Sequence, residues 1–447
     1  MDPVLLCTLA VLLVLALLVA RVPIAFSLGL SAISGLFVFY AWPNGGAFDP
    51  SRAYRPLFSL ISSQPFDFLH SYPLSMIPLF LALGHLAHQA GITTDIYHAI
   101  RVWMSKVPGG LAIASVVGCG GFSAITGSSV ACASAMGKIA VPEMLRFNYA
   151  PSLATGSVAA GGTLGSLIPP SLLFVLYGIF TEQSIGKLLL AGVIPGLISL
   201  AGYLVVIVIW VMRHPESAPA PKIEVDRREK LKSLAGAWTS FVLFGIVVLG
   251  IYGGIFTPTE AAGVGAFVAL AIGVASKRLK LAGIKLALTE TVMQTGMIFA
   301  ISIGAKMFVA LVSLTGIAPK IVELTAAAGL ADWQIMAVVV VVYLVLGCLL
   351  DSIGILVLTL PFVVPLIQSQ GFDLIWFGVI VVKLLEVGLI TPPVGLNVFV
   401  IKSVVGNQVR LETIFKGALA MICSDFFVFV LLFAFPLISL LLPNTMR

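Results

Sequence analysis

Four short clusters of glycine, hydroxyl and proline residues interrupt long apolar stretches of this 447-residue sequence. The first two are Ser123–Ser129 and Gly161–Ser171, and the last two are Gly347–Gly354 and Thr391–Gly395. In a bilayer, each cluster would break a helix and release backbone carbonyls that need a partner. Breaks of this kind are typical of ion and solute sites. Because the clusters form two similar pairs, we expect an internal repeat.

The oxygen atoms in these clusters suit a hard cation such as Na⁺. Hydroxyls and released carbonyls supply several oxygen ligands without burying a full charge. We therefore predict two cation sites, one from each pair of clusters, and two bound Na⁺ ions. The first site consists of Gly127, Ser128, Ser129, Gly165 and Ser166, and the second consists of Asp351, Ser352, Gly354, Thr391 and Gly395.

The same breaks predict a site for an anionic substrate. Half-helices that begin after each break would point their positive N-terminal ends at the middle of the membrane, where they favour a carboxylate. The proline pairs remove backbone donors and hold the breaks open. We assign to the substrate the residues Ser123, Thr126, Pro169, Pro170, Ser171, Pro392, Pro393 and Asn397.

Some of these residues have plainer explanations. Small residues are common where transmembrane helices pack, although four clusters in two matching pairs are harder to explain in that way. Lys383 and Glu386 lie three residues apart in an apolar stretch, so they are either functional charges or an ion pair on one helix. In the sequence, no base stands near Ser128 or Ser129 and no phosphate-binding loop occurs. We therefore expect neither an enzyme nor an ATP-driven pump.

The composition indicates the class of protein that carries these clusters. With 60% hydrophobic and 10% charged residues, the chain is far more apolar than soluble proteins. Several stretches approach or exceed the about 20 residues that cross a bilayer. We predict an all-α polytopic membrane protein with about ten crossings, two re-entrant hairpins and two broken helices. The hairpins span 109–141 and 335–367, and the broken helices span 153–180 and 374–401.

The distribution of basic residues predicts the orientation. The long polar stretch 213–236 is the natural linker between the two halves, and most Lys and Arg residues fall on its side of the membrane. This side is therefore cytoplasmic. The opposite side has only Arg52, Arg55, Lys187, Lys320 and Arg447. The two hairpins then enter from opposite sides, which makes an inverted repeat, and both chain ends lie outside.

Nine stretches spread over nearly the whole chain match motifs of a known family. They are Val22–Gly29, Ile77–Phe80, Pro108–Gly110, Thr126–Ser129, Pro142–Met144, Gly165–Ser171, Phe256–Gly263, Asp351–Pro365 and Ile390–Asn397. With these motifs the sequence resembles the large membrane subunit of the tripartite ATP-independent periplasmic (TRAP) transporters. It departs from the family at Arg146–Tyr149, where Gly-Tyr is frequent, and at Cys132, where a hydroxyl residue is frequent.

The resemblance implies a secondary transporter of the elevator type in the bacterial inner membrane, which imports a small organic acid with Na⁺. It implies a transport domain formed by 109–180 and 335–401, scaffold helices in 1–108 and in 181–334, which includes the linker, and a C-terminal helix in 402–447. Two partners are implied, a small four-helix membrane subunit and a periplasmic substrate-binding protein, and no nucleic acid. The alternative is a stand-alone Na⁺-coupled symporter of divalent anions, which needs no binding protein.

Overall fold

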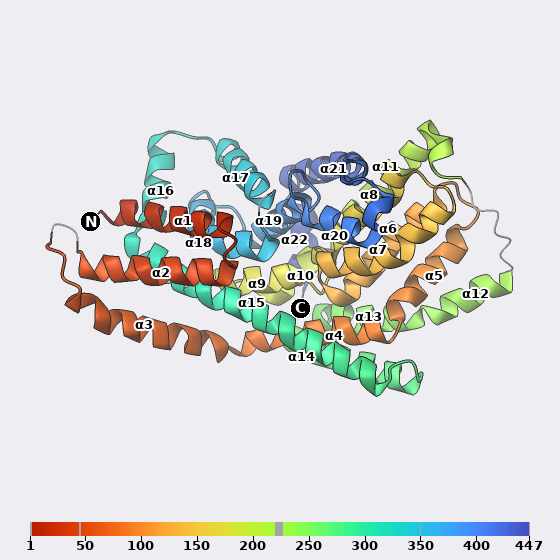
Figure 1. Ribbon diagram of the computed structural model, residues 1–447, viewed down its shortest axis with the longest axis horizontal. Helices are drawn as coiled ribbons and strands as arrows, with labels where there is room; N and C mark the ends of the chain where they lie inside the picture. Colours follow the sequence, from red (N-terminus) through yellow and green to blue (C-terminus); the bar gives the residue numbers. More distant parts are fainter. Residues whose placement is uncertain (1, 44–45, 220–226, 349, 447) are drawn as a thin grey trace. The chain divides into compact units, whose positions relative to one another are not determined.

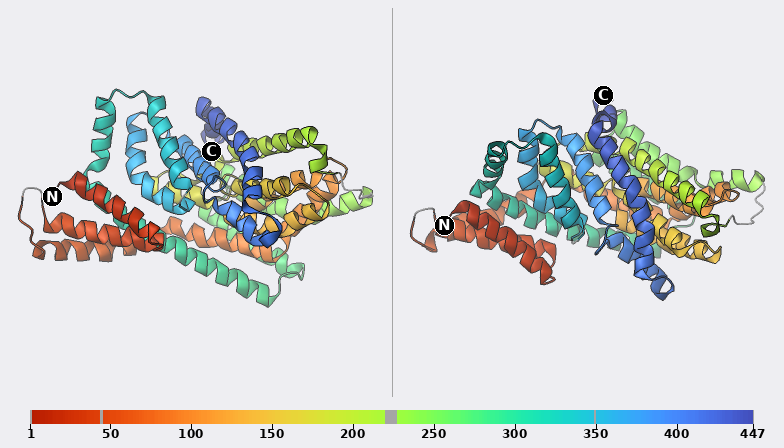
Figure 2. Two further views of the ribbon diagram at one scale, coloured as in Figure 1. Left: turned by 45° about the horizontal axis from the view of Figure 1, so that its top comes forward. Right: turned by 90° about the horizontal axis from the view of Figure 1, so that it is seen from above.

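The computed structural model describes residues 2–43, 46–219, 227–348 and 350–446. Every regular element in this part of the chain is a helix, and both views in Figure 2 show helices without strands. The predicted all-α class is therefore confirmed. The chain forms two compact units. Unit 1 comprises Met1–Ser75, Val292–Val342 and Ile353–Leu374, and unit 2 comprises Met76–Thr291, Tyr343–Ser352 and Ile375–Arg447.

Unit 1 begins with helices that pack in sequence order near the N-terminus. Helix α1 packs against α2, and α2 packs against α3. A Cβ atom at Gly304 would lie 2.5 Å from the Ala25 carbonyl oxygen, so the long helix α15 approaches α2 at backbone distance. The helices with residues in unit 1 are α1 (Pro3–Val19), α2 (Ile24–Ala41), α3 (Ser51–Leu69), α15 (Leu281–Thr315), α16 (Ile317–Ala327), α17 (Asp332–Gly347) and α18 (Ser352–Ser369).

Unit 2 contains both breaks that follow the predicted hairpins. Its helices are α4 (Met76–Gln89), α5 (Ile92–Met104), α6 (Gly110–Thr126), α7 (Ser129–Arg146), α8 (Pro151–Thr163), α9 (Leu172–Thr181), α10 (Ile185–Ala191), α11 (Val193–Arg213), α12 (Arg227–Gly236), α13 (Trp238–Tyr252), α14 (Pro258–Ala275), α19 (Leu374–Gly388), α20 (Leu396–Val405), α21 (Leu411–Ala434) and α22 (Leu437–Thr445). Helices α6 and α7 pack against each other and against α8 (Figure 1). This trio brings the first two clusters together.

Small residues allow the helices of unit 2 to pack closely around α8. A Cβ atom at Gly156 would lie 2.3 Å from the carbonyl carbon of Gly417, so α8 and α21 meet at backbone distance. The buried core around them includes Met136 of α7, Val158 of α8 and Met421 of α21. Part of the glycine content therefore serves ordinary helix packing, as the alternative interpretation held.

The breaks fall where the sequence places them. Only Gly127 and Ser128 separate α6 from α7, and residues 164–171 separate α8 from α9 without α-helix. The second hairpin breaks at 348–351, where Leu349 lies outside the described residues, and the second broken helix breaks at 389–395. Glycine, serine and proline concentrate at these points, which explains why local composition locates them.

Several segments expected to be loops are helical instead. Arg52 and Arg55 lie in α3, whose start is stabilised by the Asp49 carboxylate accepting from the Ser51 N–H at 3.0 Å. Arg101 lies in α5, and α16 was not predicted at all. The expected linker ends in helix α12, while its residues 220–226 lie outside the described part. These helices carry too many polar residues to be found by searching for apolar spans.

The final crossing is shorter than predicted. A single helix was expected over 417–442, but α21 ends at Ala434 and α22 begins at Leu437. Pro436 causes the break, because it has no N–H and disfavours helical geometry at Phe435. Phe435 has non-helical backbone angles, φ −129° and ψ 76°.

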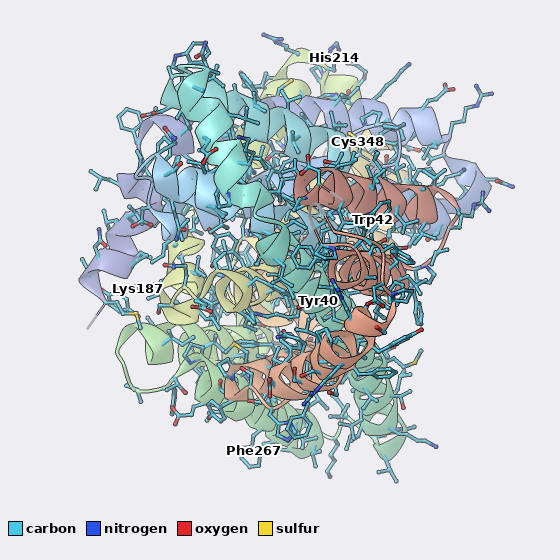
Figure 3. All side chains as sticks on the ribbon, turned by 90° about the vertical axis from the view of Figure 1, so that its left-hand side faces the viewer. Tyr40, Trp42, Lys187, His214, Phe267 and Cys348 are labelled. Carbon is cyan, nitrogen blue, oxygen red and sulfur yellow. The ribbon has the colours of Figure 1, made fainter. Side chains whose placement is uncertain are left out.

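Seven helices of the described residues are long and apolar enough to cross a membrane, or eight if Ser51–Leu69 and Tyr72–Gln89 form one span. Shorter apolar helices also occur, such as α6 and α9 on either side of the first breaks. The count of ten crossings stays a prediction. Large apolar side chains project from several of these helices, as Phe267 does from α14, where it is 69% exposed (Figure 3). Such side chains suit contact with lipid.

Candidate functional site

The first broken helix turns sharply where the sequence predicts a cation site. After α8, residues Leu164–Ser166 form a tight 3₁₀ turn, and α9 begins only at Leu172. Ser171 caps α9, since its hydroxyl accepts from the Phe174 N–H at 3.3 Å. The same hydroxyl donates to the Ser166 carbonyl. Ser171 thus fixes the chain across the break, a role that uses both its donor and its acceptor.

The tip of the α6–α7 hairpin touches this break through backbone atoms. A Cβ atom at Gly165 would lie 2.8 Å from the Ser129 nitrogen and 2.9 Å from the Ser128 carbonyl oxygen. Gly127 has φ +63°, a left-handed conformation that favours glycine, and a Cβ there would lie 2.2 Å from the Pro170 carbonyl oxygen. Side chains at these positions would separate the two elements. The structure therefore brings together the residues of the first predicted cation site.

Two hydroxyls and one carboxylate meet at this contact. The Ser129 and Ser166 hydroxyls are 2.9 Å apart, and the Ser129 hydroxyl donates to the Glu386 Oε2 at 2.5 Å. Glu386 lies on α19, just before the second break, and only 1% of it is exposed. Sequence reasoning recognised Glu386 as a charge in an apolar stretch but did not connect it with Ser129.

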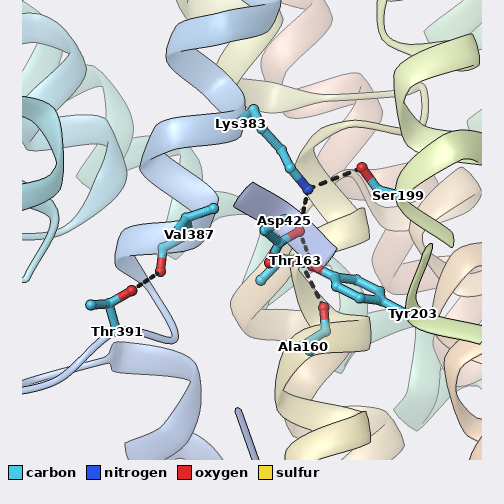
Figure 4. Close-up of polar contacts among 8 residues, drawn as sticks. All are labelled: Ala160, Thr163, Ser199, Tyr203, Lys383, Val387, Thr391 and Asp425. Atoms are coloured by element: carbon cyan, nitrogen blue, oxygen red, sulfur yellow. Dashed lines mark hydrogen bonds and ion pairs between the residues drawn. The ribbon is translucent and has the colours of Figure 1, made fainter. Parts of the chain in front are cut away.

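Lys383 has a different partner from the one considered on its own helix. Its ammonium pairs with Asp425 of α21 and donates to the Ser199 hydroxyl at 3.0 Å. Figure 4 shows the Lys383 side chain pointing towards these two residues. Lys383 and Asp425 are each 1% exposed. The ion pair therefore joins α19 to α21, and Glu386 belongs to the neighbouring hydroxyl contact.

A tyrosine completes the surroundings of Asp425. The Tyr203 hydroxyl lies 2.7 Å and 2.9 Å from the two carboxylate oxygens of Asp425 and 2.8 Å from the Thr163 hydroxyl. Thr163 ends α8, three residues before Ser166. Asp425 was missed in the sequence, although a lone aspartate inside the apolar stretch 411–434 is itself a signal.

The residues of the second predicted cation site are divided between the two units. Asp351, Ser352, Thr391 and Gly395 belong to unit 2, whereas Gly354 belongs to unit 1. The Thr391 hydroxyl donates to the Val387 carbonyl of its own helix at 2.7 Å (Figure 4). The Ser352 hydroxyl is buried without a hydrogen-bond partner among the described residues.

The second break shares a proline pair and a closely packed glycine with the first. Both proline pairs, Pro169–Pro170 and Pro392–Pro393, have a cis peptide bond. Gly395 has φ +59°, and a Cβ there would lie 2.9 Å from the Phe415 ring and 3.2 Å from the Thr391 carbonyl oxygen. As at the first break, a glycine stands where a side chain would not fit.

The predicted substrate residues lie in two different settings. Ser123 and Thr126 bond within the hairpin, since Ser123 faces the Cys132 sulfur at 3.7 Å and Thr126 donates to the Phe122 carbonyl at 3.2 Å. Asn397 instead reaches from the second break to the first half, where its amide nitrogen donates to the Ala159 carbonyl at 3.4 Å. Its Oδ1 is buried without a partner among the described residues, so it is available to a ligand.

The donors around Ser129 are those of a hard cation. Among the described residues, no three or more His, Cys, Asp or Glu side chains are grouped so that they could hold a metal ion. The hydroxyls of Ser129 and Ser166 and the carboxylate of Glu386 supply oxygen only, the ligand that hard cations prefer.

Comparison with known proteins decides the family. Residues 11–438 match the family model described as "Tripartite ATP-independent periplasmic transporter, DctM component". The chain belongs to this TRAP transporter family. As a TRAP large permease it is a multi-pass membrane transport subunit and not an enzyme.

Two relatives illustrate the similarity. The C4-dicarboxylate TRAP transporter large permease protein DctM of Pseudomonas aeruginosa is 36% identical over 384 residues, which cover 85% of this chain and 88% of the relative. The sialic acid TRAP transporter large permease protein SiaM of Vibrio cholerae is 30% identical and covers 96% of both chains. The similarity therefore extends over nearly the whole TRAP permease.

Solved structures of other transporters share the fold. The YdaH transporter of Alcanivorax borkumensis aligns with a TM-score of 0.62 at 16% identity, covering 97% of this chain and 98% of that one. MtrF of Neisseria gonorrhoeae aligns with a TM-score of 0.59 at 13% identity, covering 97% and 95%. At such low identity the likeness describes the architecture of the TRAP permease alone.

Proposed function

We propose that this TRAP permease imports a small organic anion together with Na⁺ across the bacterial inner membrane. The anion is delivered by a periplasmic substrate-binding protein, and the permease works with a small four-helix membrane subunit. Family membership supports the tripartite arrangement over a stand-alone symporter of divalent anions. The names of the relatives support an acidic substrate, since C4-dicarboxylates and sialic acid are both carboxylates.

The contact at Ser129 carries the Na⁺ part of this proposal. It gathers two hydroxyls, one carboxylate and the backbone of a helix break in a buried place. Gly127, Ser128, Ser129, Gly165 and Ser166 would hold one ion, and the second set, from Asp351 to Gly395, would hold another. Two ions and the absence of a phosphate-binding loop in the sequence make the sodium gradient the driving force.

The substrate carboxylate would lie at the capped helix starts of the first hairpin and the first broken helix. Ser128 caps α7 and Ser171 caps α9, and the free N–H groups and dipole at a helix start favour an anion. The buried Asn397 Oδ1 and amide supply polar contacts from the second half. In this arrangement the hairpins and broken helices, 109–180 and 335–401, move as the transport domain of an elevator.

Replacing Ser129 or Ser166 with alanine is expected to raise the Na⁺ concentration for half-maximal uptake roughly tenfold, because losing about 1.4 kcal/mol of binding changes the equilibrium tenfold. Uptake is measured in proteoliposomes that contain the permease and its small subunit, with the loaded binding protein outside. Ser62→Ala removes an exposed hydroxyl of α3 that bonds to its own helix and serves as control. Unchanged Na⁺ dependence in both variants would remove the first cation site.

The orientation has its own test. In a chain whose five cysteines are replaced, Glu216→Cys should be shielded from a membrane-impermeant thiol reagent in intact cells, and Asn444→Cys should react. Both positions are exposed, so accessibility depends on the side of the membrane. Inverted vesicles should reverse the pattern. Labelling of Glu216→Cys alone in intact cells would place the termini in the cytoplasm and overturn the orientation predicted from the basic residues.

A further inference from the structure

Unit 2 buries three charged side chains within one connected group of polar residues. Lys383 and Asp425 form an ion pair, and Glu386 interacts electrostatically with both of them. Each of the three is 1% exposed. Two carboxylates face one ammonium, so the group carries one net negative charge when both acids are ionised. We call Lys383, Glu386 and Asp425 the buried charge group.

The two carboxylates of this group differ in their partners. Asp425 has the Lys383 ammonium and the Tyr203 hydroxyl as partners. The Glu386 Oε2 accepts a hydrogen bond from Ser129, and the Ser166 hydroxyl also interacts with the Glu386 carboxylate. The Oε1 of Glu386 is buried without a hydrogen-bond partner among the described residues. A buried carboxylate oxygen without a partner is costly. A cation that neutralises the net negative charge of the buried charge group would therefore lie beside Glu386, on the side that faces Ser129 and Ser166.

The surroundings of Glu386 offer oxygen ligands for that charge. The Ser129 hydroxyl touches both Glu386 and the Ser166 hydroxyl. The Ser128 carbonyl oxygen lies beside Gly165, since a Cβ there would be 2.9 Å from it. Hydroxyl, carbonyl and carboxylate oxygens together suit a small hard cation. A divalent ion would leave an excess positive charge, whereas a monovalent ion neutralises the buried charge group.

We propose that Glu386 is the charged ligand of the first cation site and that its carboxylate recruits one monovalent cation to the tip of the first hairpin. This inference rests on the proposed function, because it takes Na⁺ to be the ion. In this proposal Glu386, on helix α19 of the second broken helix, is a ligand of the ion that binds at the first hairpin and the first broken helix. Ion binding would then hold α19 against the hairpin and the first break.

The test measures equilibrium binding of ²²Na⁺ to the purified permease in complex with its small subunit, in choline chloride at constant ionic strength. Glu386→Gln keeps the size of the side chain and one acceptor oxygen but removes its charge. It is expected to weaken binding at one site at least about tenfold, because a charge–charge interaction of several kcal/mol is lost. Glu386→Asp, which keeps the charge on a shorter side chain, should lose less.

Glu143→Gln is the control, since Glu143 is a partly buried glutamate that pairs with Arg101 and Tyr97 away from the first cation site. It should bind Na⁺ as the unmodified permease does. Equal Na⁺ binding by Glu386→Gln and the unmodified permease would overturn the inference while leaving Na⁺ coupling intact. Absence of Na⁺ binding in the unmodified permease would instead overturn the proposed function itself, and this inference with it.

Competition by Ca²⁺ and the Na⁺ affinity of Glu386→Asp complete the test. Ca²⁺ at the same charge concentration should not displace ²²Na⁺, and displacement would contradict a site for a monovalent ion. If Glu386→Gln elutes as an aggregate from size-exclusion chromatography, Glu386→Asp decides alone. Its Na⁺ affinity should then fall severalfold, by less than about tenfold, and an unchanged affinity would exclude the carboxylate as a ligand.

Discussion

Gly165→Ala should lower uptake at least about tenfold, because a core position with no free space penalises even one added methyl by about 1–3 kcal/mol. The new Cβ would lie 2.8 Å from the Ser129 nitrogen and the Ser128 carbonyl carbon, both backbone atoms that cannot turn aside. The hairpin tip must therefore move away from the break. That movement separates Ser129 from Ser166 and dismantles the first cation site.

Uptake in proteoliposomes and ²²Na⁺ binding test this result together. Gly296→Ala provides the control, because Gly296 lies within α15 with nothing within 4 Å of its added Cβ. There alanine favours the helix by up to about 1 kcal/mol, so uptake should be unchanged. Normal uptake and Na⁺ binding by Gly165→Ala would show that the hairpin and the break work without this close contact.

The helix breaks could be predicted from the sequence because the residues at each break cause it. Gly127 and Gly395 need left-handed backbone, and each proline pair stops a helix, so composition alone marks the positions. The structure confirms breaks at both hairpins and both broken helices. The same search for apolar runs missed α3, α5 and α12, whose charged residues resemble loops until their helical faces are considered.

The polar partners in the site could not be predicted in the same way. Ser129 and Glu386 are 257 residues apart, and Tyr203 and Asp425 are 222 apart. A single sequence carries the types of these residues but not their pairing, which depends on how α7, α11, α19 and α21 pack. The spacing of Lys383 and Glu386 suggested a pair along one helix, and packing between helices gave each of them a different partner.

The two predicted cation sites differ in whether the structure brings their residues together. Ser129, Gly165 and Ser166 meet because their elements adjoin in the chain as well as in space. The second set combines Thr391 and Gly395 with residues on either side of the division between the two units. Na⁺ binding at the second set therefore remains a prediction from the repeat.

Lys383→Met is expected to destabilise the permease by about 3–5 kcal/mol, since removing one partner of a buried ion pair leaves the other charge without compensation. Among the described residues, the buried Asp425 would keep only the Tyr203 hydroxyl as a hydrogen-bond donor (Figure 4). The midpoint of thermal unfolding in detergent should fall clearly. Lys320→Met, which breaks the exposed pair of Lys320 and Glu323 on α16, should leave it unchanged.

The double variant Lys383→Met with Asp425→Asn should recover most of the lost stability. Asparagine still accepts from the Tyr203 hydroxyl, and no unpaired charge remains, so the cost falls towards that of a neutral buried contact. Because the pair is neutral, its removal leaves the charge of Glu386 in place. We therefore expect ²²Na⁺ binding to persist in this variant. If the double variant were no more stable than Lys383→Met, Lys383 and Asp425 would not act as a pair. The Lys383 ammonium would then stabilise the Glu386 carboxylate instead.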